Sequence, residues 1–179
     1  GPRAVKYGTP RDKTLGLRAV IGTAEVLHTG VQTTKGVVGY DLTRLIIGSE
    51  GTLALVTEAT LKLTPLPEAK RTLRATYVDI HSAARAVSAI MAQPVTPCAL
   101  EFMDASAIAM VSGYAGLDLP EGAGALLMIE VDGPAACIQE AQAAVAAAAR
   151  CDGLLELRLA ASAEEVAALW KTRKALSPS

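Results

Sequence analysis

The proline-containing segment at residues 64–68 most constrains what this chain can fold into. Proline holds φ at about −65° and has no N–H for a sheet ladder, so Pro65 and Pro67 end the strand pattern before them. We therefore predict a boundary that separates residues 1–66 from residues 67–179. The first part is rich in strands and glycines, whereas the second alternates between strand and helix periods.

Three strands are predicted in the first part. Segments 15–21 and 25–28 are rich in β-formers and are separated by Gly-Thr-Ala at 22–24, which predicts a hairpin. A glycine-punctuated segment, 30–51, follows. Segment 53–63 alternates as a strand does, with four leucines on one parity: Leu53, Leu55, Leu61 and Leu63.

The second part predicts an α+β fold. Strands are expected at 73–78, 99–103, 125–131 and 154–159, and helices at 82–93, 105–112, 134–150 and 163–176. Ser162 and Glu165 have the spacing of a capping box, which starts the last helix at Ala163. Short strands interleaved with alanine-rich helices favour a sheet covered by helices, most simply a ferredoxin-like layer.

Composition excludes several classes of function. With 51% hydrophobic residues the chain can bury a core, and 17 Lys and Arg against 18 Asp and Glu leave no basic excess for nucleic acid or anionic membranes. No apolar run approaches the roughly 20 residues of a transmembrane helix. Cys98, Cys137 and Cys151 are odd in number and widely spaced, which predicts reduced, buried thiols in a cytoplasmic protein. His28 and His81 offer no metal-ligand spacing.

Arg173 lies on the apolar face of the last predicted helix. It follows Leu169 by four residues and Trp170 by three, and Val166 and Leu176 share that face. Its stem can cover apolar surface while its head reaches water. Alternatively, its planar guanidinium can bind a carboxylate through two parallel hydrogen bonds. An arginine in this position needs a partner in either case, and Trp170 is interpreted as a core residue.

Two other groups of residues have both a structural and a functional interpretation. Gly48 and Gly51 flank a turn that either lets the backbone approach a phosphate or adenine, or only shapes a tight hairpin. Tyr40 and Asp41 either approach a cofactor or stabilise the glycine-rich loop.

Glu101 and Asp104 stand in and beside an apolar strand, where they form either an acid–base pair or carboxylates bonded to backbone amides. We favour the structural interpretation for both, because buried carboxylates are normally paired.

Several spaced motifs resemble one family of flavoproteins. Residues 35–42 (Lys-Gly-Val-Val-Gly-Tyr-Asp-Leu) and 47–57 (Ile-Gly-Ser-Glu-Gly-Thr-Leu-Ala-Leu-Val-Thr) resemble the second half of the PCMH-type FAD-binding domain of vanillyl-alcohol oxidase type enzymes. Residues 1–8 (Gly-Pro-Arg-Ala-Val-Lys-Tyr-Gly), 11–12 and 169–174 match the same family. Within it, the chain is most similar to the FAD-linked component of glycolate oxidase and to the D-lactate (D-2-hydroxyacid) dehydrogenases.

The resemblance implies that residues 1–66 complete the FAD-binding domain and that residues 67–179 form an incomplete ferredoxin-like cap domain. It implies that Arg173 binds the substrate carboxylate, and Ser177, one turn later on the same predicted face, can add a hydroxyl contact. The family usually has glycine at Ala54, where a methyl group is either tolerated or pushes the strand slightly away from the flavin nucleotide. The residues that the resemblance places at FAD are Gly8, Gly48, Glu50, Gly51, Ala54, Leu55 and Val56.

The implied reaction is hydride transfer from a 2-hydroxy acid, such as glycolate or D-lactate, to FAD. The first phosphate-binding glycine loop and any metal ligands are expected outside these residues, so the fragment by itself is expected to be inactive. The implied partners are a second flavoprotein-like subunit and an iron–sulfur subunit, which would bring a cytoplasmic protein to a membrane. The alternative is a non-enzymatic ferredoxin-like module for binding or oligomerisation.

Overall fold

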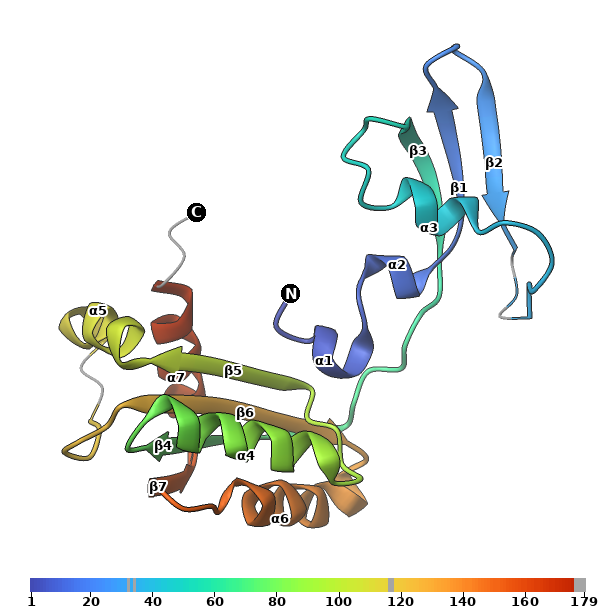
Figure 1. Cartoon of the computed structure of the whole chain (residues 1–179). Coiled ribbons are helices and arrows are strands. Elements are labelled where there is room, and N and C mark those ends of the chain that lie inside the picture. Colours follow the sequence, from blue (N-terminus) through green and yellow to red (C-terminus); the bar gives the residue numbers. More distant parts are fainter. Residues whose placement is uncertain (32, 34, 116–117, 176–179) are drawn as a thin grey trace. The chain divides into compact units, whose positions relative to one another are not determined.

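The computed structural model describes residues 1–31, 33, 35–115 and 118–175, which form two compact units (Figure 1). The first unit runs from Gly8 to Leu66. The second unit begins at Pro67 and also contains residues 1–7. The boundary between the two units along the chain therefore falls at the proline-containing segment, and residues 1–7 pack with the second unit.

The first unit is a three-stranded antiparallel sheet in the order β2-β1-β3. The predicted hairpin is present, with Ala19 opposite Leu27 and the turn closed by a hydrogen bond from Ala24 N to Ile21 O at 2.9 Å. A small core contains Leu17, Ala19, Ile46 and Ala54. The elements are α2 (Pro10–Lys13), β1 (Thr14–Ile21), β2 (Val26–Gly30), α3 (Leu42–Ile46) and β3 (Ala54–Leu61).

The four leucines whose alternation predicted the outer strand β3 are exposed. The alternation predicted the strand correctly, but Leu55 is 68% exposed and Leu63 is 86% exposed. Leu53 and Leu61 are also exposed. Within the described residues, the apolar parity of this segment therefore faces solvent rather than a core.

The second unit has a ferredoxin-like sheet. Its four strands are antiparallel in the order β5-β6-β4-β7, so β6 separates β4 from β5, and β4 separates β6 from β7. This order confirms the predicted fold class, with α5 and α7 added to the basic pattern. The strands are β4 (Ala69–Tyr77), β5 (Ala99–Asp104), β6 (Ala125–Gly133) and β7 (Leu154–Leu159).

The helices of this unit are α1 (Ala4–Tyr7), α4 (Ile80–Ala92), α5 (Ala105–Ala115), α6 (Ile138–Ala149) and α7 (Ala163–Ala175). A 3₁₀ turn, Ala135–Cys137, precedes α6, so the predicted helix 134–150 begins with a tighter turn. The start of α7 is capped, because Glu165 N donates to Ser162 Oγ and Ala161 N donates to the Glu165 carboxylate. None of the helices in the described ranges is long and apolar enough to cross a membrane.

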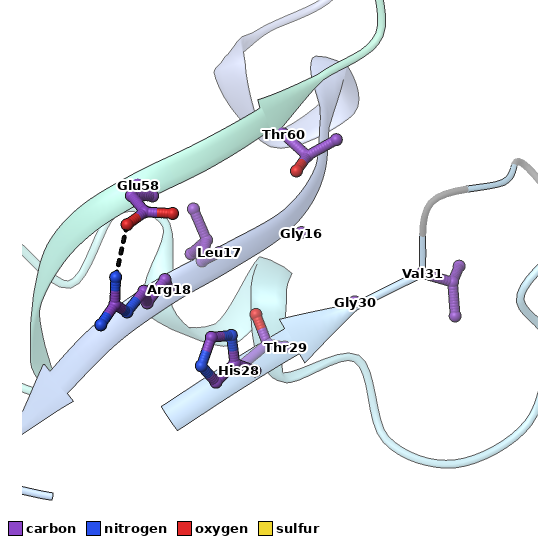
Figure 2. A pocket seen from close by; sticks show the side chains of 9 residues that line it. All are labelled: Gly16, Leu17, Arg18, His28, Thr29, Gly30, Val31, Glu58 and Thr60. Atoms are coloured by element: carbon purple, nitrogen blue, oxygen red, sulfur yellow. Dashed lines mark hydrogen bonds and ion pairs between the residues drawn. The ribbon is translucent and has the colours of Figure 1, made fainter. Parts of the chain in front are cut away.

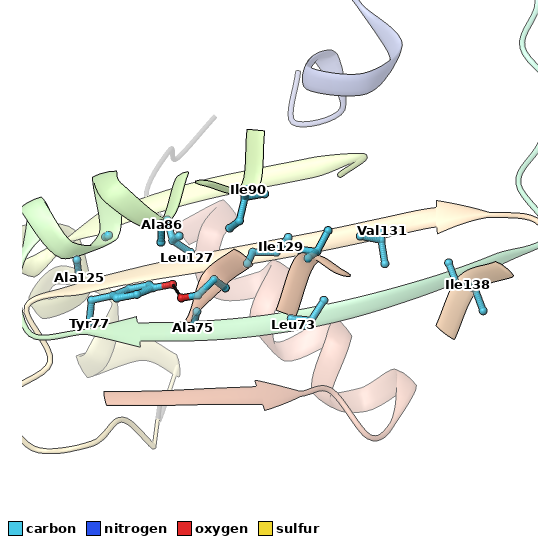
Figure 3. Close-up of a cluster of buried hydrophobic side chains, with 13 residues drawn as sticks. Leu73, Ala75, Tyr77, Ala86, Ile90, Ala125, Leu127, Ile129, Val131 and Ile138 are labelled. Atoms are coloured by element: carbon cyan, nitrogen blue, oxygen red, sulfur yellow. Dashed lines mark hydrogen bonds between the residues drawn. The ribbon is translucent and has the colours of Figure 1, made fainter. Parts of the chain in front are cut away.

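One face of the sheet packs against α4 and α6 (Figure 3). Leu73, Leu127 and Ile129 alternate along their strands with residues of the opposite face and contribute to this core. The Tyr77 hydroxyl donates to the Ala149 carbonyl at 2.7 Å, and burial raises the pKa of this phenol. The apolar periodicity of the second part therefore has its source in this core.

The opposite face carries a row of buried polar side chains. Thr72 pairs with Glu130 and Lys70 pairs with Asp132 across β4 and β6, and directly opposed residues share a face. Glu130 is completely buried and Asp132 is 6% exposed. Side chains from α1 and α7 cover and bond this row, which makes it the setting of the candidate site.

Candidate functional site

Asp132 fastens residues 1–7 to the sheet. Lys6 Nζ donates to Asp132 Oδ1 at 2.5 Å and to the Asp132 carbonyl at 2.7 Å, while the Tyr7 hydroxyl donates to Oδ2 at 2.8 Å. Burial would raise the pKa of Asp132, but hydrogen bonds from Lys6, Tyr7 and Cys98 outweigh it and hold the pKa below its usual value. Burial, followed by the bond to Asp132, raises the pKa of Tyr7 to about 12.

Glu130 connects β6 to α7 and to the first residues of the chain. Its Oε1 accepts from Trp170 Nε1 at 2.7 Å and from Thr72 Oγ1 at 3.2 Å. Its Oε2 lies 3.5 Å from Lys70 Nζ and 3.8 Å from Arg3 Nη2, too far for a hydrogen bond but close enough for charge compensation. Trp170 therefore does more than fill a core, because its indole N–H helps to hold α7 on the sheet.

Arg173 pairs with Glu101. Arg173 Nε donates to Glu101 Oε2 at 2.8 Å, and the two side chains are 35% and 17% exposed. The expected partner of Arg173 is therefore present, but the prediction that Glu101 bonds to backbone amides was wrong. Asp104 does behave as predicted, since its Oδ1 accepts from Ala107 N at 2.8 Å at the start of α5. Ser177 lies outside the described residues.

The turn between α3 and β3 has the backbone form of an anion-binding loop. Gly48, Glu50 and Gly51 have φ of 91°, 50° and 82°, and runs of such residues can aim successive N–H groups into one concavity. Among the described residues, the N–H groups of Glu50 and Gly51 have no hydrogen-bond acceptor. A Cβ built on Gly51 meets no atom within 4 Å, so the space beside this turn is open. These features fit a phosphate group such as FAD carries.

The remaining residues that the resemblance assigns to FAD have different environments. Gly8 has φ of 74°, and a Cβ there would lie 2.9 Å from Asp12 Cβ. The local backbone conformation and this close contact therefore explain why a glycine suits this position. Ala54 is 6% exposed and belongs to the core, so its methyl group is accommodated within the unit. Leu55 and Val56 are exposed and accessible to a ligand.

Asp41 and Tyr40 take different roles in the loop before α3. Asp41 Oδ1 accepts from Arg44 N at 2.9 Å and caps α3, which matches the structural interpretation. Tyr40 is 97% exposed. Asp41 therefore orders the start of α3, whereas the Tyr40 side chain is left almost fully open to solvent.

The cysteines are free thiols, but they do not share one environment. Cys98 is buried, Cys151 is partly buried and Cys137 is exposed, so the prediction of buried thiols was wrong for Cys137. Burial, followed by the charge of Asp132, raises the pKa of Cys98 to about 12, which keeps this thiol protonated.

A hollow of about 320 Å³ lies on the sheet of the first unit (Figure 2). Gly16 and Gly30 line it from opposite positions on β1 and β2, where a Cβ on either glycine would clash with backbone atoms of the neighbouring strand. Arg18 Nη1 donates to Glu58 Oε1 at 2.6 Å along its edge, with His28 opposite Arg18. None of the residues singled out from sequence as ligand contacts lines this hollow.

Comparison with known proteins identifies the family. Residues 66–179 match the family model described as FAD linked oxidases, C-terminal domain. The chain belongs to this family. The match covers the ferredoxin-like sheet, helices α4 to α7 and Arg173, and it agrees with the family expected from the motifs.

Relatives match over nearly the whole chain. It is 41% identical to glycolate oxidase subunit GlcD of Bacillus subtilis over 97% of its length, which is 37% of that protein. It is 34% identical to the mitochondrial cytochrome-type D-lactate dehydrogenase of Arabidopsis thaliana over 97% of its length, or 30% of that protein. The chain thus spans about a third of the length of these relatives.

A solved structure of an alkyldihydroxyacetonephosphate synthase shares the fold. Its TM-score is 0.67 at 20% identity, and the match covers 98% of this chain and 33% of that one. At this identity the likeness describes the fold and not the substrate.

Proposed function

We propose that this chain is part of an FAD-dependent oxidoreductase that oxidises a 2-hydroxy acid such as glycolate or D-lactate. The proposal is supported by membership of the FAD-linked oxidase family and by relatives that are named as a glycolate oxidase component and as a D-lactate dehydrogenase. Bound FAD supplies the hydride acceptor. The residues of this chain bind and orient the two reactants.

The turn at 48–51 is proposed to hold a phosphate or neighbouring polar group of FAD. Its support is the pair of free N–H groups at Glu50 and Gly51 beside open space. Backbone N–H groups suit this role because they donate to an anion without a side chain that must be ordered first. Leu55 and Val56, which follow on β3, offer an exposed apolar surface for the uncharged parts of the cofactor.

Arg173 is proposed to bind the carboxylate of the substrate. The observation that carries this proposal is that Arg173 uses its Nε for Glu101 while its side chain remains 35% exposed. As far as the described residues go, the two terminal nitrogens then remain for a ligand, and their fixed geometry matches a carboxylate. Ser177 is proposed to add a hydroxyl contact.

The decisive experiment uses the full-length parent protein. Purified protein should contain about one FAD per chain, and its flavin absorbance should bleach when glycolate or D-lactate is added without oxygen. A protein without flavin, or one whose flavin no 2-hydroxy acid reduces, would instead support the non-enzymatic ferredoxin-like module. The two substrates are compared by kcat/KM, since the relatives bear names of both kinds.

The parent is further proposed to act beside a second flavoprotein-like subunit and an iron–sulfur subunit. The support is that the Bacillus subtilis and Escherichia coli relatives are named as subunits of a glycolate oxidase. Isolation of the tagged parent from its own cells, followed by iron and sulfide analysis, tests this assembly. Fractionation of the same cells tests whether a cytoplasmic protein reaches the membrane through these partners.

A further inference from the structure

We propose that Glu101 is a positioning residue that fixes the guanidinium of Arg173 for the substrate carboxylate. The inference rests on the proposed function, because it assigns Glu101 a role in the binding of the same 2-hydroxy acid. It goes beyond that function because Glu101 touches Arg173 and not the substrate.

The bond between the two side chains occupies one edge of the guanidinium. Arg173 Nε donates to Glu101 Oε2 at 2.8 Å. Among the described residues, the terminal nitrogens of Arg173 have no other acceptor. Since a guanidinium is planar, a fixed Nε fixes the direction of both terminal N–H pairs. The arginine is thereby prepared to meet a carboxylate with two parallel bonds.

Glu101 is itself held in place by the sheet. It lies on β5 opposite Met128 of β6, so its side chain shares the polar face with Glu130. Glu130 bonds Trp170 Nε1 at 2.7 Å, one helical turn before Arg173. Carboxylates on the neighbouring strands β5 and β6 therefore bond two residues of α7, Trp170 and Arg173, that lie one helical turn apart. These two bonds set both the rotation of the helix about its axis and the direction of the Arg173 side chain.

The atom of Arg173 that Glu101 contacts indicates whether Glu101 orients the arginine or competes with the substrate carboxylate for it. A carboxylate that competed with the substrate for the free end of the guanidinium would occupy the two terminal nitrogens. Glu101 instead contacts Nε. Removal of Glu101 should therefore weaken substrate binding, because Arg173 loses its orientation, whereas removal of a competitor would strengthen it.

The test measures kcat and KM for the 2-hydroxy acid in the full-length parent carrying Glu101→Ala or Glu101→Gln. We expect Glu101→Ala to raise KM about tenfold or more and to lower kcat/KM by about 10²-fold, the size of effect that misplacement of a binding group by about 1 Å produces. Glu101→Gln should stay within a few-fold of wild type, since its amide oxygen still accepts from Nε. Pyruvate, the product of D-lactate oxidation, should bind the oxidised protein more weakly in the same variants. This binding is measured by the change in the flavin absorbance spectrum.

The matched control is Asp104→Asn, which changes another carboxylate of β5 but keeps a good cap for α5. It should leave KM unchanged. Flavin content and melting temperature are recorded for each variant, and Glu101→Met replaces Glu101→Ala if the alanine variant does not fold. Unchanged or lowered KM in the apolar variant, or a glutamine variant as impaired as alanine, would overturn the inference.

Failure of the inference differs visibly from failure of the proposed function. If Arg173→Lys impairs the enzyme while the Glu101 variants behave as wild type, the positioning role of Glu101 is wrong and the substrate site stands. If Arg173→Lys has no effect, or the parent oxidises no 2-hydroxy acid, the substrate site is wrong and the role of Glu101 falls with it.

Discussion

Within the part of the chain that the structure describes, Arg173 has its Nε bonded to Glu101 and its terminal nitrogens unbonded, so its identity should matter more for the reaction than for folding. Arg173→Lys keeps the positive charge but loses the two-pronged geometry. In the full-length parent we expect kcat/KM for the 2-hydroxy acid to fall by about 10² to 10³, the effect of losing a charged hydrogen bond of a few kcal/mol. The melting temperature should change little, and steady-state kinetics with calorimetry check both.

Arg158→Lys is the control for this substitution. Arg158 lies on β7 and its Nη1 is 3.8 Å from an oxygen of the exposed Asp118, a surface ion pair of little energetic weight. It should leave both kinetics and stability close to wild type. Near-normal kcat/KM with a lowered melting temperature in Arg173→Lys would show a purely structural arginine.

Asp132 makes the stability of the second unit depend on pH. Its folded pKa is depressed, so it contributes stability above the ordinary aspartate pKa of about 3.9, and this contribution is lost as the pH falls through its lower folded value. Asp132→Asn should cost about 1–3 kcal/mol at pH 7, because it weakens the bonds to Lys6 and Tyr7. Urea unfolding at pH 7 and at pH 3 should show this difference shrinking in acid. A constant difference would contradict the assignment.

At the scale of elements, the sequence predicted the strands and helices that are long enough to show an apolar periodicity. The strands and long helices of the second part were predicted because alternate apolar residues such as Leu127 and Ile129 meet one core. The short helices α1, α2 and α3 were missed, since four or five residues carry no helical period. The partner of Arg173 was also beyond prediction, because it depends on which strand lies beneath α7.

Two carboxylates in the sequence of β6 mark the polar face of the sheet. Glu130 and Asp132 interrupt an otherwise apolar strand, and a buried charge requires a partner. Their partners come from residues 1–7 and from α7, which are distant in sequence. Strand pattern alone can identify such a carboxylate, but long-range packing decides what it binds.

The turn between α3 and β3 can be tested by its backbone. Gly51→Val places a β-branched residue at φ of 82°, and its side chain would enter the open space beside Glu50. In the full-length parent we expect a clear loss of bound FAD. The strain should cost roughly 1–2 kcal/mol of stability. Flavin absorbance per protein and thermal unfolding provide the two measurements.

Gly122→Val is the matched control for the turn. Gly122 has φ of 81° and equally open space, but it belongs to the second unit. Similar strain should therefore lower stability there without loss of FAD. Full flavin occupancy in Gly51→Val would separate this turn from the nucleotide.

At the scale of the molecule, the chain crosses between its units twice, after Tyr7 and after Leu66. The second unit has an extensive core, whereas the first has a small one and exposes apolar side chains on and after β3. Exposed apolar surface of this kind marks sites of contact with other protein or ligand. The exposed apolar side chains of the first unit therefore mark a surface suited to contact with further protein or with a ligand.

We accordingly predict that the 179-residue chain by itself binds FAD weakly and oxidises no 2-hydroxy acid. The turn at 48–51 supplies a few backbone donors, and a few isolated contacts do not offset the entropy lost when a large cofactor is immobilised. The chain is mixed with excess FAD and passed through a gel-filtration column, and flavin absorbance is compared with protein. The full-length parent, treated in parallel, should retain about one FAD per chain. A yellow 179-residue chain with one flavin per molecule would show that its first unit holds a sufficient cofactor site, and hydride transfer would then have to be sought within these residues.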